Sequence, residues 1–423
     1  TEYQSHLRWQ PADRLIMATP AGDSHQVASG GVIAAGRHLL PSWVPPTGKF
    51  QNISLNILND VKPAGWPTTD GGGPFVNWAG GVYAKDFSSR GAMVIHGSGH
   101  LSQGAPVWAG VWCFDLSTLS WVGRNIPSAP LQEQPANTAY YNQYYESLSA
   151  GTEGHPYAPH TYDALVYQPS NLGGGASGSM LRTFYAGTGT DVKNAIHRFD
   201  LSSPTSPPTR VIDDLVMGSD GNYAMTASDD ARGGYWIMQT SGVGPLKFVH
   251  YADWSVSSWN VAYGTYGDNS LIYLPAPFDC LVGMGRADMA NTIFNVYVCP
   301  IVGGVPQGFT QVATSGTPPS DGRSGGVWSE LLNCIVAYQG RASYIVHKLT
   351  PPTGNLTTGT WAWASETLSA VNGETPSQAL NSQNGLPFDN GAWSRFMEVK
   401  SARCFIWGEG VNNPVQAWRL TGM

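Results

Sequence analysis

Residues 321–337 read DGRSGGVWSELLNCIVA, and this stretch holds the pattern that decides the fold. Asp with Gly opens an apolar run, a short turn follows, and a second apolar run begins at Cys334. The same phrase recurs with variations at Asp220, Asp268 and Asp389, so the opening Asp residues lie 48, 53 and 68 residues apart. A repeat of about 50 residues with about four short strands per unit is typical of propeller blades. We therefore predict an all-β fold, a single propeller of four-stranded blades.

The repeats favour six blades. The first covers about residues 78–127, the second covers about 155–215, and the others begin near residues 218, 264, 318 and 388. A seventh blade could be formed by residues 1–45 or by the Tyr-rich connection 128–154, and this alternative stays open. We divide the chain into an N-terminal extension, 1–45, and a propeller domain, 46–423.

The two ends of the propeller domain predict how the ring closes. Residues 49–58 alternate apolar and polar side chains, as a half-buried strand does. The last apolar run, 415–420, would be only the third strand of its blade. We expect residues 49–58 to supply the missing outer strand, because a closed ring leaves no exposed sheet edge at the junction.

Composition and charge exclude several classes of partner. Only 12% of the residues are charged, while Gly (51) and Trp (16) are abundant, as suits a body of tight turns and aromatic packing. The net charge is −7 and no run of Lys or Arg stands out, which argues against nucleic acid or an anionic membrane surface as a partner. No apolar stretch approaches the ~20 residues of a membrane span.

The five cysteines predict burial rather than disulfides. Cys280, Cys334 and Cys404 hold the same place in the phrase, at the head of a second strand. Equivalent positions in neighbouring blades lie beyond the Cα separation of about 7 Å that a disulfide tolerates. The chain begins at Thr1 without a signal peptide; we expect a secreted or extracellular protein whose signal is not part of this sequence, acting as a monomer.

Further motifs carry a family resemblance. A second strand ends in Gly97-Ser98-Gly99, a third reads Val-Trp-Cys-Phe-Asp-Leu at 111–116, and fourth strands contain an aromatic residue such as Trp121, Trp259, Trp361 or Trp363. Over about residues 49–423 the blades resemble the kelch-type β-propeller family, which includes galactose-oxidase-like and polysaccharide-lyase-like propellers. The family's paired glycines are Gly-Ser-Gly or a single Gly here. The resemblance implies architecture, since propellers carry many functions.

Candidate catalytic residues come from loops that should meet on one face around the channel. His100 ends the run 96–100, where it could act as a base or a metal ligand. His160 and Tyr162, two apart, should point to the same side and suit proton abstraction and return. Tyr223 precedes the innermost strand of the third blade. The alternative is structural: His160 could cap a turn and Tyr162 could pack in the core.

Candidate substrate-binding residues fall near the same face. Arg286, Arg323 and Arg395 would form an anion site in a chain this poor in charge, suited to bidentate carboxylate binding. Alternatively, each Arg pairs with an Asp of its own turn. Aromatic side chains that could stack on sugar rings, unless they pack inside the blades, are Trp78, Trp108 and Trp393. No zinc- or calcium-type ligand spacing, nucleophile elbow or phosphate loop is present in the sequence, so we expect neither a metal nor a cofactor.

These residue types favour a carbohydrate-directed function with a polysaccharide or glycan as partner. The leading prediction is a metal-independent polysaccharide lyase that cleaves uronic-acid chains by β-elimination. The alternative is a non-catalytic glycan- or protein-binding propeller, such as an adhesion or virion surface module. A copper-radical oxidase of the galactose-oxidase type requires a cysteine beside a metal-bound tyrosine in a loop of the ring face. This class is disfavoured because the cysteines here fall in strands. A glycoside hydrolase would need two facing carboxylates, and Asp163, Asp191 and Asp288 show no pairing pattern.

Overall fold

The computed structural model describes residues 15–18, 24–27, 40–66, 79–96, 110–127, 161, 163–188, 191–213, 215, 224–239, 244–261, 270–286, 294–320, 324–340, 342–378 and 392–423. For residues 15–18, 24–27, 184–188, 191–194, 239 and 286 this description covers the backbone alone. The chain forms two compact units, Thr1–Pro41 and Ser42–Met423. The first contains an antiparallel hairpin of β1 (Leu15–Ala18) and β2 (Ser24–Val27).

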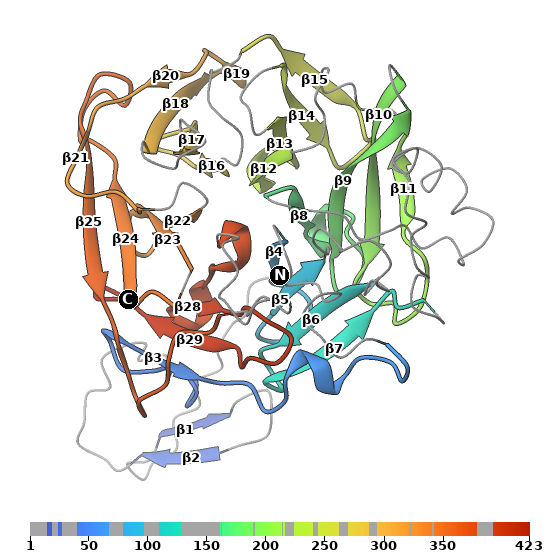
Figure 1. Ribbon diagram of the computed structural model, residues 1–423, viewed down its shortest axis with the longest axis vertical. Coiled ribbons are helices and arrows are strands. Elements are labelled where there is room, and N and C mark those ends of the chain that lie inside the picture. The colour runs from blue at the N-terminus through green and yellow to red at the C-terminus, as the bar shows by residue number, and fades with distance from the viewer. Residues whose placement is uncertain are drawn as a thin grey trace, which may run out of the picture. The chain divides into compact units, whose positions relative to one another are not determined.

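The second unit is a six-bladed β-propeller, as the repeat predicts (Figure 1). Blade one consists of β4 (Gly80–Ala84), β5 (Ala92–His96), β6 (Val111–Asp115) and β7 (Ser120–Arg124). Blade two consists of β8 (Leu165–Gln168), β9 (Ser179–Thr188), β10 (Asp191–Asp200) and β11 (Thr209–Ile212). Blade three consists of β12 (Ala224–Asp229), β13 (Gly234–Gln239), β14 (Leu246–His250) and β15 (Val256–Trp259).

The remaining blades each carry an additional short strand. Blade four consists of β16 (Ser270–Leu274), β17 (Cys280–Arg286), β18 (Phe294–Val302) and β19 (Val305–Pro306), with β20 (Thr310–Gln311) also paired to β18. Blade five consists of β22 (Gly325–Ser329), β23 (Cys334–Tyr338), β24 (Ile345–Thr350) and β25 (Trp361–Thr367), with β21 (Thr314–Ser315) at its edge. Blade six consists of β27 (Met397–Val399), β28 (Cys404–Trp407), β29 (Gln416–Arg419) and β3 (Lys49–Asn52), with β26 (Ser369–Ala370) at its edge.

The ring closes through strand β3, as predicted. β3 pairs antiparallel with β29, so that Phe50 lies opposite Trp418 and their rings stack at 4.4 Å. The innermost strands also contact one another in sequence, and β27 contacts β4 to complete the circle. The predicted strand 49–58 is too long, because regular pairing ends at Asn52 and the last contacts with the strand β29 segment are those of Ile53 and Ser54 with Val415. The Leu55 amide donates instead to the Leu119 carbonyl of blade one, and a 3-10 turn, η1 (Leu58–Asp60), follows.

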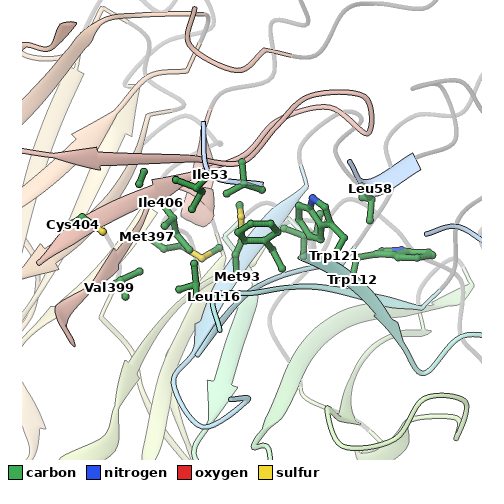
Figure 2. Close-up of a cluster of buried hydrophobic side chains, with 14 of the residues drawn as sticks. Ile53, Leu58, Met93, Trp112, Leu116, Trp121, Met397, Val399, Cys404 and Ile406 are labelled. Atoms are coloured by element: carbon green, nitrogen blue, oxygen red, sulfur yellow. The ribbon is translucent and has the colours of Figure 1, made fainter. Parts of the chain in front are cut away.

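Six hydrophobic clusters fill the six interfaces between neighbouring blades. Second strands such as β23 and β28 are buried along their whole length, because each of their faces packs against a different blade. This explains why they read as continuous apolar runs rather than as an alternating pattern. Figure 2 shows the cluster at the closure, where Met93 and Trp112 of blade one meet Met397 and Ile406 of blade six.

The cysteine prediction is confirmed. All five cysteines are free and buried, and Cys280, Cys334 and Cys404 each begin a second strand. Burial raises the pKa of the Cys334 thiol to about 11, so it behaves as a small apolar residue. Among the described residues, no helix has the length and hydropathy of a membrane span.

Candidate functional site

The ring has two faces, which strand direction defines. We call upper the face on which the innermost strands begin, at residues such as Gly80 of β4 and Ser270 of β16. Second strands end and third strands begin on the same face, as His96 of β5 and Val111 of β6 show. The lower face carries the turns between the first two strands of each blade. Of the predicted site residues, Arg286 at the end of β17 and Arg395 just before β27 lie at this face.

Asp163, just before β8, lies at the centre of the upper face. Its carboxylate oxygen Oδ2 accepts the backbone N–H of Leu271 in blade four at 3.1 Å. The hydroxyl groups of Ser270 in blade four and Ser394 in blade six also hydrogen-bond this carboxyl. Its main chain forms a parallel bridge with Met225 in blade three. One residue of blade two thus contacts three other blades.

Thr161 fixes the same segment to the remaining neighbour, blade one. Its hydroxyl accepts the Gly80 amide at 2.7 Å and donates to the carbonyl of His96 at 2.9 Å. On the other side, the Thr226 amide and hydroxyl of blade three both donate to the Asp163 carbonyl. The backbone on either side of Tyr162 is therefore held from blades one, three, four and six.

The Asp163 carboxyl has an unusual proton affinity. The side chain is 6% exposed. Burial raises the pKa of the Asp163 carboxyl to about 8, and the hydrogen bonds from Leu271, Ser394 and Ser270 lower it only in part. The group is therefore mostly a neutral acid at pH 7. As a neutral acid, Asp163 itself places no fixed negative charge at this point of the upper face.

Two predicted substrate-binding residues lie in the interior of blade six. Trp393 and Arg395 both belong to the 3-10 turn η5 (Trp393–Arg395), and their side chains are 1% and 0% exposed. The Arg395 guanidinium bonds the Glu409 carboxylate at 3.3 Å and lies 5.5 Å from the centre of the Trp407 ring. Burial lowers the pKa of Arg395 and the Glu409 charge raises it in part. A ligand-binding role for these two residues stays a prediction.

His96, which begins the predicted His-Gly-Ser-Gly-His run, is a structural residue. It is fully buried, its Nδ1 lies 2.6 Å from the Gly110 carbonyl, and its Nε2 lies 2.6 Å from Nη1 of Arg182. Nδ1 therefore carries the proton and Nε2 accepts from Arg182. Burial, together with the charge of Arg182, holds the pKa of His96 well below its usual range. A neutral imidazole between two fixed partners cannot act as an accessible base.

Most of the predicted residues lie outside the described part of the chain: His100, His160, Tyr162, Tyr223, Arg323, Trp78 and Trp108. Arg286 is the last residue of β17, where its backbone pairs with Phe294. Of the carboxylates considered for a hydrolase, Asp191 begins β10 and Asp288 is not described. Within the described ranges no group of three or more His, Cys, Asp or Glu side chains could hold a metal ion.

Sequence reasoning missed three groups that organise the upper face: Asp163 as its centre, Arg182 behind His96, and Glu409 as the partner of Arg395. One signal for Arg182 was available, because a lone charge stands in the apolar start of β9, Ser-Met-Leu-Arg-Thr. Asp163 gave no such signal. Its partner Leu271 is 108 residues away, on a different blade.

The lower face holds charged side chains in ion pairs between blades. Arg232, in the turn η4 (Asp230–Arg232), bonds Asp229 of its own blade at 2.6 Å and Asp279 of blade four at 2.7 Å. Lys85 of blade one pairs with Asp230 of blade three at 3.1 Å. In these ion pairs the charges of Arg232, Lys85 and their Asp partners are neutralised within the protein. Their role is therefore structural.

The fold and the upper face define a six-bladed β-propeller with a neutral, hydrogen-bonded centre. No protein-family model and no curated protein sequence matches the chain. Over 88% of this chain and 75% of the other, it is similar to a structural-genomics protein of unknown function from Bacteroides thetaiotaomicron, at 10% identity and a TM-score of 0.45.

Two carbohydrate-directed enzymes are also similar in structure. An α-L-arabinanase from Penicillium chrysogenum is 12% identical over 88% of this chain and 98% of that chain, with a TM-score of 0.42. An α-L-arabinofuranosidase from Fusarium graminearum is 13% identical over 85% of this chain and 95% of that chain, with a TM-score of 0.42. Likeness at this level carries no argument about activity. The resemblance to kelch-type blades stays a prediction.

Proposed function

We propose that the propeller acts on a glycan, as a metal-independent lyase that cleaves a uronic-acid-containing polysaccharide by β-elimination. The observation that supports this proposal is the anchored segment at the centre of the upper face. Thr161 and Asp163 fix the backbone on both sides of Tyr162, and His160 precedes them directly. A base and an acid need fixed positions relative to the substrate, and anchoring to four blades supplies that.

The electrostatics of the described residues suit a polyanionic chain. Asp163 is mostly neutral at pH 7, and the charge of Glu409 is balanced by Arg395. Among the described residues, a uronate carboxylate that approaches Asp163 therefore meets no unpaired negative charge from Asp163 or Glu409. In this proposal Arg286 and Arg323 neutralise the sugar carboxylate, and Trp78 and Trp108 pack against sugar rings. Arg395 and Trp393 are buried and would support the face from behind.

β-Elimination needs a base and an acid, and in this proposal a histidine is the base and a tyrosine is the acid. A base, His160 or His100, takes the proton from C5 of the uronic acid, whose acidity the neutralised carboxylate increases. The electron pair forms the C4–C5 double bond as the C4–O bond breaks. Tyr162 or Tyr223 gives a proton to the leaving oxygen. The products are an unsaturated uronic-acid end and a new reducing end, with no water consumed.

The test is an incubation with a panel of uronic-acid polysaccharides (alginate, pectate, ulvan, glucuronan and glycosaminoglycans) in the presence of a chelator. The proposal expects a rise in far-ultraviolet absorbance, from the double bond conjugated with the carboxylate of the unsaturated product, on at least one polysaccharide. His160→Ala should reduce turnover by on the order of 1000-fold while glycan binding persists. His250→Gln is the matched control, since His250 ends β14 on the lower face and should leave turnover unchanged. A flat trace across the panel contradicts the lyase proposal.

A second candidate is a non-catalytic glycan- or protein-binding propeller, acting as an adhesion or virion surface module. It is favoured by the burial of Arg395 and Trp393, two of the groups that a catalytic face was expected to expose. This candidate expects binding on a glycan array without turnover. Affinity should then fall on Trp78→Ala or Trp108→Ala, with no change on His160→Ala.

A further inference from the structure

We propose that Asp163 is a positioning residue of the upper face, which holds the entry to blade two against blades three, four and six and so acts on its sequence neighbours His160 and Tyr162. For the roles of His160 and Tyr162 this inference rests on the proposed function. The anchoring itself stands on contacts between described residues, so it is testable without any substrate.

The Asp163 carboxyl contacts blades that are not neighbours of its own. Asp163 belongs to the start of blade two, yet its oxygen accepts the Leu271 amide of blade four, with blade three between them in the chain. It also bonds the hydroxyl of Ser394 in blade six. Ser394 in turn accepts the Gly81 amide of blade one at 3.1 Å. Hydrogen bonds between neighbouring blades need no such reach. This carboxyl links blades across the axis.

The Asp163 carboxyl makes these contacts between blades without a counter-ion among the described groups. The described ionisable side chains on the innermost strands, on η5 and on β9, which pairs with β8, are Tyr83, Tyr167, Arg182, Asp229, Tyr273, Arg395 and Glu398. Asp229 is paired with Arg232, and Arg395 is paired with Glu409. The proton affinity of Asp163 is set by burial and by three hydrogen bonds, with no charged group among its causes.

The protonation state of Asp163 makes the anchoring dependent on pH. Since the pKa of Asp163 is raised to about 8, alkaline pH places an unpaired charge in a buried site, which costs free energy. Local opening of the segment relieves that cost by letting water reach the carboxylate. The anchored geometry should therefore hold below about pH 8 and loosen above it.

Three variants separate this role from general stability. Asp163→Asn keeps a carbonyl oxygen for the Leu271 amide but cannot ionise, and Asp163→Ala removes the acceptor. Glu398→Gln is the matched control. Glu398 is also buried with a raised pKa, but it lies on β27 and accepts from Ser329 in blade five, away from the segment.

Hydrogen exchange of the Leu271 and Thr226 amides gives a readout that needs no substrate. At about pH 6, Asp163→Ala should speed exchange at these two amides by on the order of 10-fold over the wild type, and Glu398→Gln should not. Between about pH 7 and pH 9 the wild type should lose protection beyond the intrinsic base-catalysed increase, and Asp163→Asn should not. Unchanged exchange in Asp163→Ala, or the same pH response in Asp163→Asn as in the wild type, overturns the proposal. If Asp163→Ala fails to fold, the Asp163→Asn comparison decides.

Turnover provides the second readout, on whichever polysaccharide the wild type cleaves. Asp163→Ala should lower kcat by on the order of 100-fold, Asp163→Asn should retain it, and the alkaline fall of kcat should be absent from Asp163→Asn. Loss of kcat in the Asn variant equal to that in the Ala variant contradicts a positioning role. If the wild type cleaves nothing while the exchange results follow the prediction, the proposed function fails and the anchoring by Asp163 stands.

Discussion

On the lower face, neighbouring blades are joined by charged pairs at short turns, whereas the centre of the upper face is joined by a neutral acid and serine hydroxyls. Arg232 bonds carboxylates of blades three and four. Asp163 bonds a backbone amide and hydroxyls of blades four and six. Charged side chains that are already paired within the protein interact only weakly with a ligand. The described charges of the lower face therefore stabilise the ring, and the proposed glycan site is assigned to the upper face.

The largest expected effect is the pH dependence of stability that comes from the buried Asp163 carboxyl of the upper face. The pKa of Asp163 is raised to about 8, so the stability linked to its proton is full below the unfolded value near 4 and is lost as pH rises to about 8. Relative to Asp163→Asn, the wild type should lose roughly 4–6 kcal/mol of unfolding free energy over that window. Glu398→Gln should flatten the pH profile in the same direction. Denaturant titrations at several pH values measure both, and a wild-type profile parallel to that of Asp163→Asn would refute the neutral-acid account.

The next effect compares the loss of unfolding free energy on replacing Arg395 with the loss on replacing Arg232. Arg395→Met leaves Glu409, 3% exposed, without its buried partner, and should cost about 3–5 kcal/mol of unfolding free energy. Replacing Glu409 by Gln as well should recover most of this loss. Arg232→Met should cost less, roughly 1–3 kcal/mol, because Asp279 is 33% exposed and the buried Asp229 keeps hydrogen bonds from the Trp236 ring N–H and the residue-232 amide. Urea unfolding of the variants ranks them, and an equal loss for both arginines contradicts the contrast between faces.

The smallest effect belongs to the exposed pair of Lys400 and Glu330, whose side chains are 55% and 54% exposed. Lys400→Ala should change the unfolding free energy by no more than about 1 kcal/mol, and less at high salt. Thermal unfolding at low and high ionic strength checks this. A loss as large as that of Arg232→Met, independent of salt, would show that the lower face depends on this pair more than its exposure implies.

The architecture could be predicted from the sequence because its causes are local and repeated. Second strands such as Cys334–Tyr338 are apolar throughout since both faces are buried, and the turn signals recur at blade spacing. Ring closure followed from one incomplete blade at the C-terminus and one unpartnered strand near the N-terminus. The end of that strand at Asn52 was not predictable, since it depends on the Leu119 carbonyl of another blade.

The sequence predicted on which face of the ring the site should lie, but not which side chains contact one another there. Its loops follow from strand direction, but the partner of each side chain does not, because contacts around a ring join distant parts of the chain. His96 reads as a possible base until Arg182, 86 residues away, is placed on its Nε2. Arg395 reads as a ligand for a carboxylate, and it has one, but that carboxylate is Glu409 of the protein itself.

The central claim is that ligands bind on the upper face, and a hydrogen-exchange footprint tests it most directly. The probe is a mixture of short oligouronides prepared from pectate and alginate, added in excess to His160→Ala so that it is not cleaved. The account predicts slower exchange at the amides of Thr226 and Leu271 and no change in the lower-face turn 230–233. Protection confined to that lower-face turn, or none at any described amide, would contradict it.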